Sequence, residues 1–328
     1  MKLTRFSDLG DVRLRAVTAY LPEQRVTTEE LFPNEAKDLI RLTGIEARHI
    51  AAPSQATSDL AIEAARPLLS QGPIDRVLLA TVSPDYPSPA TAPLVQHGLG
   101  LERVPSVDLS AACAGFGYAL DLAARCVLTG DRGVLAIAAE TRSRAVATAR
   151  PGVRALFGDG AAAAYVALGG SGHRLLATMV GADGVGHAAV RIEAGGTRHP
   201  TTVETLAAGK HTIAMEDGPT VMFTAIDGFV ELAKTFLDGL GIEASSIDLL
   251  VPHQANVRIL ERVAKMLGIA REKTIICVQN TGNVGGASAG IALVRATSEG
   301  RIIPGARVLL LTAGAGYTMA AALLEAGT

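Results

Sequence analysis

Cys113 is the residue of this sequence best placed for covalent chemistry. It stands in Asp108-Leu-Ser-Ala-Ala-Cys-Ala-Gly-Phe-Gly, between an expected strand and an expected helix. The backbone N–H groups and the positive end of the following helix would favour a thiolate, the nucleophilic form of cysteine. A small buried cysteine is the alternative interpretation, and we adopt it for Cys126 and Cys277, which lie inside an expected helix and an expected strand.

Two further residues, His253 and Asn283, stand at similar junctions. His253 follows a strand in Val251-Pro-His-Gln-Ala-Asn, and Asn283 precedes a helix in Asn280-Thr-Gly-Asn-Val-Gly-Gly-Ala-Ser. If the chain contains two similar halves, Asn283 is the counterpart of Cys113, and His253 lies at the same end of the sheet. The three side chains can then converge. Taken singly, His253 could be a structural histidine and Asn283 a turn residue.

Gly314, Ala315 and Gly316 follow the last expected strand in Gly314-Ala-Gly-Tyr. Together with the N–H of Cys113, their backbone N–H groups could stabilise a developing oxyanion. An ordinary tight turn is the alternative interpretation.

Short β-rich runs alternate with alanine-rich helical stretches, which is typical of an α/β protein with buried strands. The expected strands are residues 77–82, 104–109, 134–138, 249–251, 274–278 and 308–312. The expected helices are residues 114–129, 256–267 and 286–299, each followed by a glycine that can end it.

The sequence also repeats itself at an offset of about 170 residues. Asp75 corresponds to Asp248, Gly130 to Gly300 and Val134 to Val308, at offsets of 173, 170 and 174 residues. These pairs predict two similar halves, residues 1–170 with the cysteine and 171–328 with the histidine and asparagine. Coincidence among segments rich in Ala, Val and Gly is the alternative.

The composition excludes several classes of protein. Hydrophobic residues make up 48% of the 328 residues and charged residues 19%, which rules out intrinsic disorder. A net charge of -2 and only 4% aromatic residues argue against a nucleic-acid partner. Three scattered cysteines are too few for a disulfide framework, and no apolar run is long enough to span a membrane. We therefore expect a soluble, cytoplasmic protein.

Taken together, the motifs resemble the β-ketoacyl-ACP synthase III family of the thiolase superfamily, where ACP is acyl carrier protein. The resemblance runs from Thr43-Gly-Ile-Glu-Ala-Arg-His to the end of the chain. It rests on Ala-Ala-Cys113-Ala-Gly-Phe, Phe157-Gly-Asp-Gly, Val-Pro-His253-Gln-Ala-Asn-Val-Arg, Gly-Asn283 and Gly314-Ala-Gly-Tyr. It implies an α/β protein with a duplicated, five-layered αβαβα thiolase fold, usually a homodimer.

The resemblance also implies an acyltransferase that works in two stages. Cys113 accepts an acyl group from a thioester, with the oxyanion at the N–H groups of Cys113 and residues 314–316. His253 and Asn283 then donate hydrogen bonds to a malonyl thioester while carbon dioxide leaves. The substrates are thioesters of coenzyme A or acyl carrier protein, in fatty-acid initiation or a specialised pathway, and no metal or redox cofactor is required.

Several substrate-binding positions depart from the family pattern. Asp38, Leu42 and Pro151 stand where a Trp and two arginines usually hold coenzyme A, so delivery by a carrier protein gains weight. Ser88 replaces a bulky aromatic residue at the tunnel mouth, whereas Arg258 is retained and could contact a phosphate. The other candidates for substrate binding are Asn256, Phe157 and Met215.

Arg142 and Arg144 fall where an apolar residue usually lines the acyl pocket. An arginine there could pair bidentately with the far carboxylate of a short dicarboxylic acyl group. A succinyl or glutaryl primer, as in a biotin-type pathway, is therefore an alternative to an ordinary apolar primer. In the other interpretation both arginines point to solvent.

Two further functions stay open. An acyltransferase that acts on an alcohol or amine often carries Asp in place of Asn283, so the asparagine argues against it. A non-catalytic chain-length partner subunit would lack Cys113, whose presence argues against that function.

Overall fold

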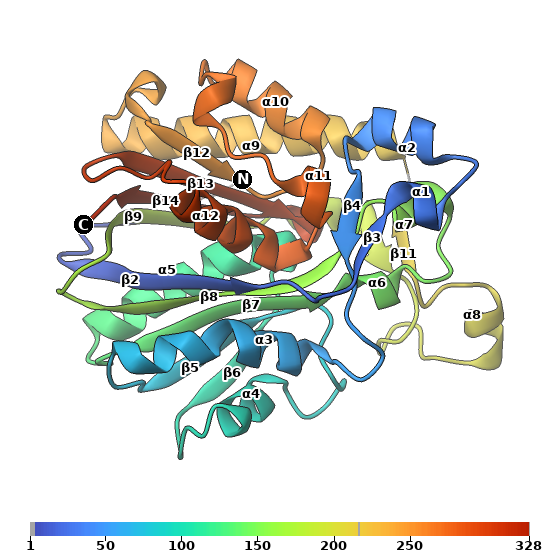
Figure 1. The fold of residues 1–328 in the computed structure, drawn as a ribbon, viewed down its shortest axis with the longest axis horizontal. Coiled ribbons are helices and arrows are strands. Elements are labelled where there is room, and N and C mark those ends of the chain that lie inside the picture. The colour runs from blue at the N-terminus through green and yellow to red at the C-terminus, as the bar shows by residue number, and fades with distance from the viewer. Residues whose placement is uncertain (1–3, 216, 328) are drawn as a thin grey trace.

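The computed structural model describes residues 4–215 and 217–327, and most of its strands form one long sheet (Figure 1). The strands of this sheet follow the order β12-β13-β14-β9-β2-β8-β7-β5-β6, with β1 beside β9. The strands are β1 (Thr4–Ser7), β2 (Val12–Tyr20), β3 (Arg25–Thr27), β4 (Ala47–His49), β5 (Arg76–Ala80), β6 (Ser106–Leu109), β7 (Val134–Thr141), β8 (Asp159–Leu168), β9 (His173–Gly181), β10 (Val190–Ile192), β11 (Ile213–Met215), β12 (Leu249–Pro252), β13 (Arg307–Gly314) and β14 (Thr318–Glu325). The α-helices are α1 (Thr28–Leu31), α2 (Ala36–Thr43), α3 (Thr57–Ala65), α4 (Ala92–Gly98), α5 (Gly115–Leu128), α6 (Arg142–Ala145), α7 (Pro151–Arg154), α8 (Val203–Ala207), α9 (Gly218–Leu240), α10 (Val257–Met266), α11 (Val278–Thr281) and α12 (Ser288–Ser298).

The long sheet has two parts, which meet where β2 and β9 pair through Arg13 with Arg174 and Leu14 with His173. Helices α5 and α12 lie between the two parts and share the central apolar core with both. Helix α3 covers the outer face of one part, and α9 and α10 cover the outer face of the other (Figure 1). The molecule therefore has the five alternating layers of helix and sheet that the sequence predicts.

Small residues let the two central helices lie between the sheets. A Cβ on Gly117 of α5 would fall 2.6 Å from the Cβ of Ala320, and one on Gly290 of α12 would fall 2.5 Å from the Cβ of Ala162. Strand β7 is buried at every position, which explains the apolar run at its residues 134–139. In the described residues, we find no helix with both the length and the apolar character needed to cross a bilayer.

The same order of strands occurs in both parts of the sheet. It reads β6-β5-β7-β8-β2 in one part and β12-β13-β14-β9 in the other, where a single bridge from Thr274 to Leu250 stands in for the outermost strand. Strand β5 thus corresponds to β12, and β7 corresponds to β13. These are the segments that repeat in the sequence. The division at residue 170 falls between β8 and β9 and stays a prediction.

The expected strand at residues 274–278 is wrong beyond its first residue. The side chain of Gln254 takes the backbone groups that a strand would use: its Oε1 accepts the N–H of Cys277 at 2.8 Å, and its Nε2 donates to the carbonyl of Ile275 at 3.1 Å. The chain then turns into α11. Cys277 therefore precedes a short helix, although it is buried as expected.

Candidate active site

Cys113 lies on a sharp turn between β6 and α5. The turn is a short 3-10 helix, Ala112–Ala114, and Ala112 has a φ of 46°, in the left-handed region that is unfavourable for a residue with a Cβ. The turn leads directly into α5, and Cys113 stays half-buried. The junction of strand and helix that the sequence predicts around Cys113 is therefore present.

The segment after β13 lies directly against the backbone of Cys113. A Cβ on Gly314 would fall 2.5 Å from the backbone nitrogen of Cys113, so only glycine fits at this position. The hydroxyl of Thr318 donates to the carbonyl of Ala111 at 2.7 Å and ties the two turns together. The turn at residues 314–316 is thus placed beside the N–H of Cys113, where an oxyanion site would require it.

The burial of Cys113 opposes the thiolate that the sequence predicts at this position. Burial raises the pKa of Cys113 to about 11, while the charge of Arg142 lowers it and that of Glu140 raises it. This pKa lies well above neutrality, so the sulfur keeps its proton before a substrate enters.

Glu140, near the end of β7, is a buried carboxyl group that the sequence analysis missed. It accepts the hydroxyl of Ser83 at 2.6 Å and the N–H of Val82 at 3.2 Å, and it also accepts the N–H of Gly286. Burial raises the pKa of Glu140. The carboxyl group anchors the loop that follows Asn283. An acidic residue near the end of an otherwise apolar strand is the sequence signal for such a group.

His253 is buried, and its two ring nitrogens have different surroundings. Nδ1 lies 2.5 Å from the Oγ of Ser288, the first residue of α12. Burial lowers the pKa of His253 to about 4, so the ring is neutral at pH 7. Nε2 has no hydrogen-bond partner within residues 4–215 and 217–327, and it is available to a ligand.

Asn283 is fixed by hydrogen bonds of its backbone and of its side-chain oxygen. Its N–H donates to the carbonyl of Leu156 at 2.8 Å, and its carbonyl accepts the N–H of Gly158 at 3.1 Å. Its Oδ1 accepts the N–H of Gly285 at 2.9 Å. Both N–H groups of Nδ2 are left without a partner in the described part of the chain.

The elements that carry these residues meet at the amino-terminal ends of α5 and α12. A Cβ on Gly286 would fall 3.1 Å from the carbonyl oxygen of Ala112, so the loop after Asn283 touches the turn that carries Cys113. His253 is joined to the first residue of α12. The structure thus brings Cys113, His253 and Asn283 to one place, and their chemical roles stay predictions.

Arg142, Phe157 and Met215 lie together beside this site. The guanidinium of Arg142 lies over the ring of Phe157, 5.4 Å from its centroid, and the residue is only 9% exposed. Met215 packs on the apolar cluster to which Phe157 belongs. Arg142 forms no hydrogen bond or ion pair with any described residue.

Arg144 has a different environment. Its side chain is exposed and donates to the carbonyls of Ala52, at 3.2 Å, and Gln55. Arg144 therefore holds the loop at residues 52–55 and does not join Arg142 in the apolar cluster.

Asn256 and Arg258 lie where α10 packs against α2. The Oδ1 of Asn256 accepts the N–H of Arg258 at 2.8 Å and caps α10, and the guanidinium of Arg258 donates to the carbonyl of Arg41 at 2.9 Å. Leu42, at the same place, is 59% exposed. A phosphate contact at Arg258 stays a prediction.

The remaining departures from the family pattern lie on the surface or make internal contacts. Asp38 forms an exposed ion pair with Arg41 at 3.0 Å. Pro151 begins α7, where Arg154 lies over the ring of Phe32, 5.3 Å from its centroid. Ser88 is exposed in the loop between β5 and α4.

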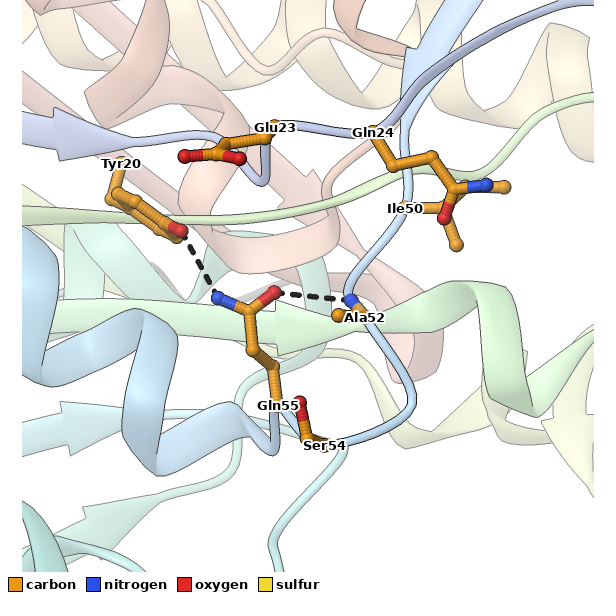
Figure 2. Close-up of a pocket in the computed structure, with 7 residues that line it drawn as sticks. All are labelled: Tyr20, Glu23, Gln24, Ile50, Ala52, Ser54 and Gln55. Carbon is orange, nitrogen blue, oxygen red and sulfur yellow. Dashed lines mark hydrogen bonds between the residues drawn. The ribbon is translucent and has the colours of Figure 1, made fainter.

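A cavity of about 600 Å³ has none of Cys113, His253 and Asn283 in its lining, although it borders the loop that Arg144 holds (Figure 2). Tyr20, Glu23, Gln24, Ile50, Ala52, Ser54 and Gln55 line it. The amide of Gln55 bridges the hydroxyl of Tyr20 and the N–H of Ala52, each at 3.0 Å, so these polar groups satisfy one another. No nucleophilic cysteine or cationic side chain is among the lining residues, and we do not assign the active site to this cavity.

Two family models match the chain. The model described as "3-Oxoacyl-[acyl-carrier-protein (ACP)] synthase III" matches residues 107–184, which include Cys113. The model of the C terminal of the same enzyme matches residues 237–326, which include His253 and Asn283.

Similar proteins match over almost the whole chain. The chain is 39% identical over 316 residues to the β-ketoacyl-[acyl-carrier-protein] synthase III of Symbiobacterium thermophilum, covering 94% of this chain and 96% of that protein. It is 38% identical over 292 residues to a 3-oxopimeloyl-[acyl-carrier-protein] synthase of Rhodothermus marinus, covering 88% of this chain and 84% of that protein. The crystal structure of 3-oxoacyl-(acyl carrier protein) synthase III from Pseudomonas aeruginosa PAO1 superposes with a TM-score of 0.87 at 31% identity and covers 97% of this chain and 99% of that one. The chain therefore belongs to the β-ketoacyl-ACP synthase III family, acyltransferases with a thiolase-like α/β fold that act as condensing enzymes, as its sequence motifs imply.

Proposed function

We propose that Cys113 carries the acyl group in the first half of a condensation reaction. The arrangement of the backbone around Cys113 supports this role. The Cys113 backbone lies against the 314–316 turn, and the loop after Asn283 and the helix that holds His253 meet at the same place. Nε2 of His253 and Nδ2 of Asn283 are uncharged donors. The sulfur attacks the thioester carbonyl, and the N–H groups of Cys113 and of the turn stabilise the oxyanion. The leaving thiolate departs with the proton that the Cys113 thiol gives up.

In the second half-reaction the enzyme extends the acyl group by two carbons. A malonyl thioester loses carbon dioxide, and the electron pair moves into its thioester carbonyl, whose oxygen accepts hydrogen bonds from His253 and Asn283. The resulting carbanion attacks the acyl carbonyl, so that a carbon–carbon bond forms and the bond to the Cys113 sulfur breaks. The thiolate then takes a proton from solvent. Neutral donors suit this step because negative charge moves from the malonyl carboxylate to the thioester oxygen only as carbon dioxide leaves.

We propose that acyl carrier protein delivers the substrates, and that coenzyme A is bound less tightly than is usual in the family. The names of the related enzymes place their products on this carrier. In this chain, Asp38, Leu42 and Pro151 supply neither the aromatic ring nor the arginines that usually hold coenzyme A. The three cysteines are free, which fits the cytoplasmic location that the sequence predicts.

We further propose that the primer carries a terminal carboxylate. A buried guanidinium in an apolar cluster needs an anion or strong acceptors. The oxygens of Glu140, the nearby carboxyl group, accept bonds from Ser83 and two backbone N–H groups, so the N–H donors of Arg142 stay open toward a ligand. The similar enzyme of Rhodothermus marinus is a 3-oxopimeloyl synthase, whose product carries a second carboxyl group. Succinyl and glutaryl groups are the primers of this kind.

The test compares each dicarboxylic primer with its neutral counterpart: succinyl with butyryl, and glutaryl with pentanoyl. A charge-assisted pair contributes about 1.5–3 kcal/mol, so the wild type should load the dicarboxylic primer roughly 10- to 100-fold faster. Arg142→Leu should reverse this ratio, and Arg144→Leu should leave it unchanged. Mass spectrometry of the intact protein reports the loading, with each primer on both coenzyme A and acyl carrier protein.

The test compares, within each variant, the loading rate of the dicarboxylic primer with that of its neutral counterpart. This ratio is needed because Arg142 also lowers the pKa of Cys113, so that its loss should slow the loading of every primer. Equal ratios in the wild type and in Arg142→Leu would contradict the carboxylate proposal and leave an apolar primer. The proposal that Cys113 carries the acyl group would be unaffected, whether the primer is dicarboxylic or apolar.

We also propose that two copies of the chain pair through β6, the last strand of the sheet. Its outer edge has no partner in the described residues, and Val107 on it is 45% exposed. The side chain of Asp108 binds the N–H groups of Thr91 and Ala92, each at 2.7 Å, so the loop with Ser88 is anchored to this edge. An antiparallel pairing of two β6 strands would bring each loop toward the other copy.

Light scattering tests the pairing. The wild type should have twice the chain mass of 33.8 kDa, and Val107→Lys should reduce the mass to that of one chain because a charged edge opposes strand pairing. A single-chain mass for the wild type at micromolar concentration would refute the homodimer.

A further inference from the structure

We propose that Ser288 sets the tautomer of His253 and so determines which ring nitrogen can donate a hydrogen bond during condensation. This positioning role rests on the proposed function of His253. Ser288 is the first residue of α12 and is 1% exposed. Its Oγ lies 2.5 Å from Nδ1 of His253 and 3.1 Å from the backbone nitrogen of Gln254, and it has no other partner among the described residues.

The protons available at Ser288 determine which group donates in each of its two hydrogen bonds. The backbone N–H of Gln254 can only donate, so it occupies one lone pair of the Ser288 oxygen. If Nδ1 also carried a proton, it would occupy the other lone pair, and the Ser288 hydroxyl proton would be buried without an acceptor. If instead the hydroxyl donates to Nδ1, the N–H of Gln254, the Ser288 hydroxyl and Nδ1 are all satisfied. The proton of the neutral ring then resides on Nε2.

The N–H of Gln254 cannot easily turn away from Ser288. The Gln254 side chain is fully buried, and its Nε2 donates to the carbonyls of Pro252 at 2.7 Å and Ile275 at 3.1 Å. Its Oε1 accepts two further backbone N–H groups, of which that of Cys277 lies at 2.8 Å. The backbone at residue 254 is therefore anchored on both sides, and the donor that faces Ser288 stays in place.

The tautomer of His253 affects both half-reactions. With the proton on Nε2, His253 offers a donor to the malonyl thioester and no free lone pair to the Cys113 thiol. His253 should therefore serve condensation and take no part as a base in loading. The low pKa of His253 agrees with this, because the ring stays neutral throughout the physiological range.

Nitrogen NMR of protein labelled at its histidines tests the tautomer directly. The wild type should show an unprotonated Nδ1 and a protonated Nε2 for His253, and the resonance is assigned by its disappearance in His253→Asn. Ser288→Ala should populate the Nδ1–H form and lower the kcat of condensation about tenfold, less than the 10²- to 10³-fold typical of losing a donor. Its rate of acyl loading should not change. Ser288→Thr, which keeps the hydroxyl, should retain the wild-type tautomer.

A wild-type ring protonated on Nδ1 would overturn the proposal without the use of any variant. An unchanged tautomer and an unchanged kcat in folded Ser288→Ala would overturn it as well. A shifted tautomer in Ser288→Ala combined with normal condensation by His253→Ala would support the role of Ser288 and refute the proposed role of His253, so the two failures are distinguishable.

Discussion

Cys113→Ala should abolish the acyl-enzyme, whereas Cys126→Ala and Cys277→Ala should still form it. Only Cys113 lies on the turn beside the backbone of Gly314. Cys277 is buried, and burial raises its pKa to about 12. Cys126 lies in the body of α5, away from the amino-terminal end that faces the site. Intact-protein mass spectrometry after incubation with acyl thioesters would report the added mass, and acyl transfer to Cys113→Ala would overturn the assignment.

The loading rate should also rise with pH. Because the thiolate is the reactive form and burial raises the pKa of Cys113 to about 11, the thiolate fraction grows about tenfold for each pH unit between pH 7 and pH 9. Rapid-quench measurements of the single-turnover loading rate would follow this slope. A rate independent of pH over this range would mean that a nearby base removes the proton of the Cys113 thiol before attack.

His253→Ala and Asn283→Ala should load acyl groups but condense them slowly, by about 10²-fold or more for each. Nε2 of His253 and Nδ2 of Asn283 have no partner in the described residues, so each is free to donate to the malonyl oxygen. The oxyanion site proposed for loading consists of backbone N–H groups, which these substitutions leave in place. Single-turnover loading and release of the 3-oxoacyl product, measured separately by mass spectrometry, would separate the two half-reactions.

Matched controls are available for both residues. His97→Ala and Asn34→Ala remove the same side chains from exposed positions and should condense at the wild-type rate. If both active-site variants condense as fast as these controls, the assignment of the two donors is wrong. If either fails to load, its residue also supports the first half-reaction.

The repeat in the sequence predicted the repeated order of strands in the fold. It could do so because it compares two segments with each other and does not depend on the helix or strand propensity of either segment alone. Residues 114–129 and 286–299 were expected to be helices, and α5 and α12 lie within those ranges. The strand expected at residues 274–278 failed because one side chain, Gln254, replaces a neighbouring strand as hydrogen-bond partner. Strand propensity takes no account of a competing hydrogen-bond partner that lies 21 to 24 residues earlier in the chain.

The positions of three candidate residues could be predicted, and the residues that support them could not all be. Cys113 and His253 could be found because each stands between a strand and a helix, and Asn283 because it precedes a helix. Ser288 could not be singled out, since its importance depends on which groups the fold brings against it, whereas Glu140 left a signal as an acidic residue near the end of an apolar strand. The thiolate expectation took account of the helix end and not of the burial of the Cys113 sulfur, which raises its pKa.

The sequence also could not distinguish Arg142 from Arg144. Both stand at the start of α6, and two residues along a helix differ by about 200° in direction, so one faces the Phe157 cluster and the other the loop at residues 52–55. Which of the two faces inward depends on where β7 ends, and helix and strand boundaries are not fixed by composition to one residue.

The contact between Gly314 and Cys113 has a consequence for biosynthesis. Chains emerge from the ribosome from the amino terminus at about 5–20 residues per second, and early segments can fold first. Cys113 is thus made about 200 residues before Gly314, the last residue of β13, against which its backbone packs. If the two form the proposed acyl-transfer site, that site is incomplete in a nascent polypeptide until β13 has folded against the turn that carries Cys113.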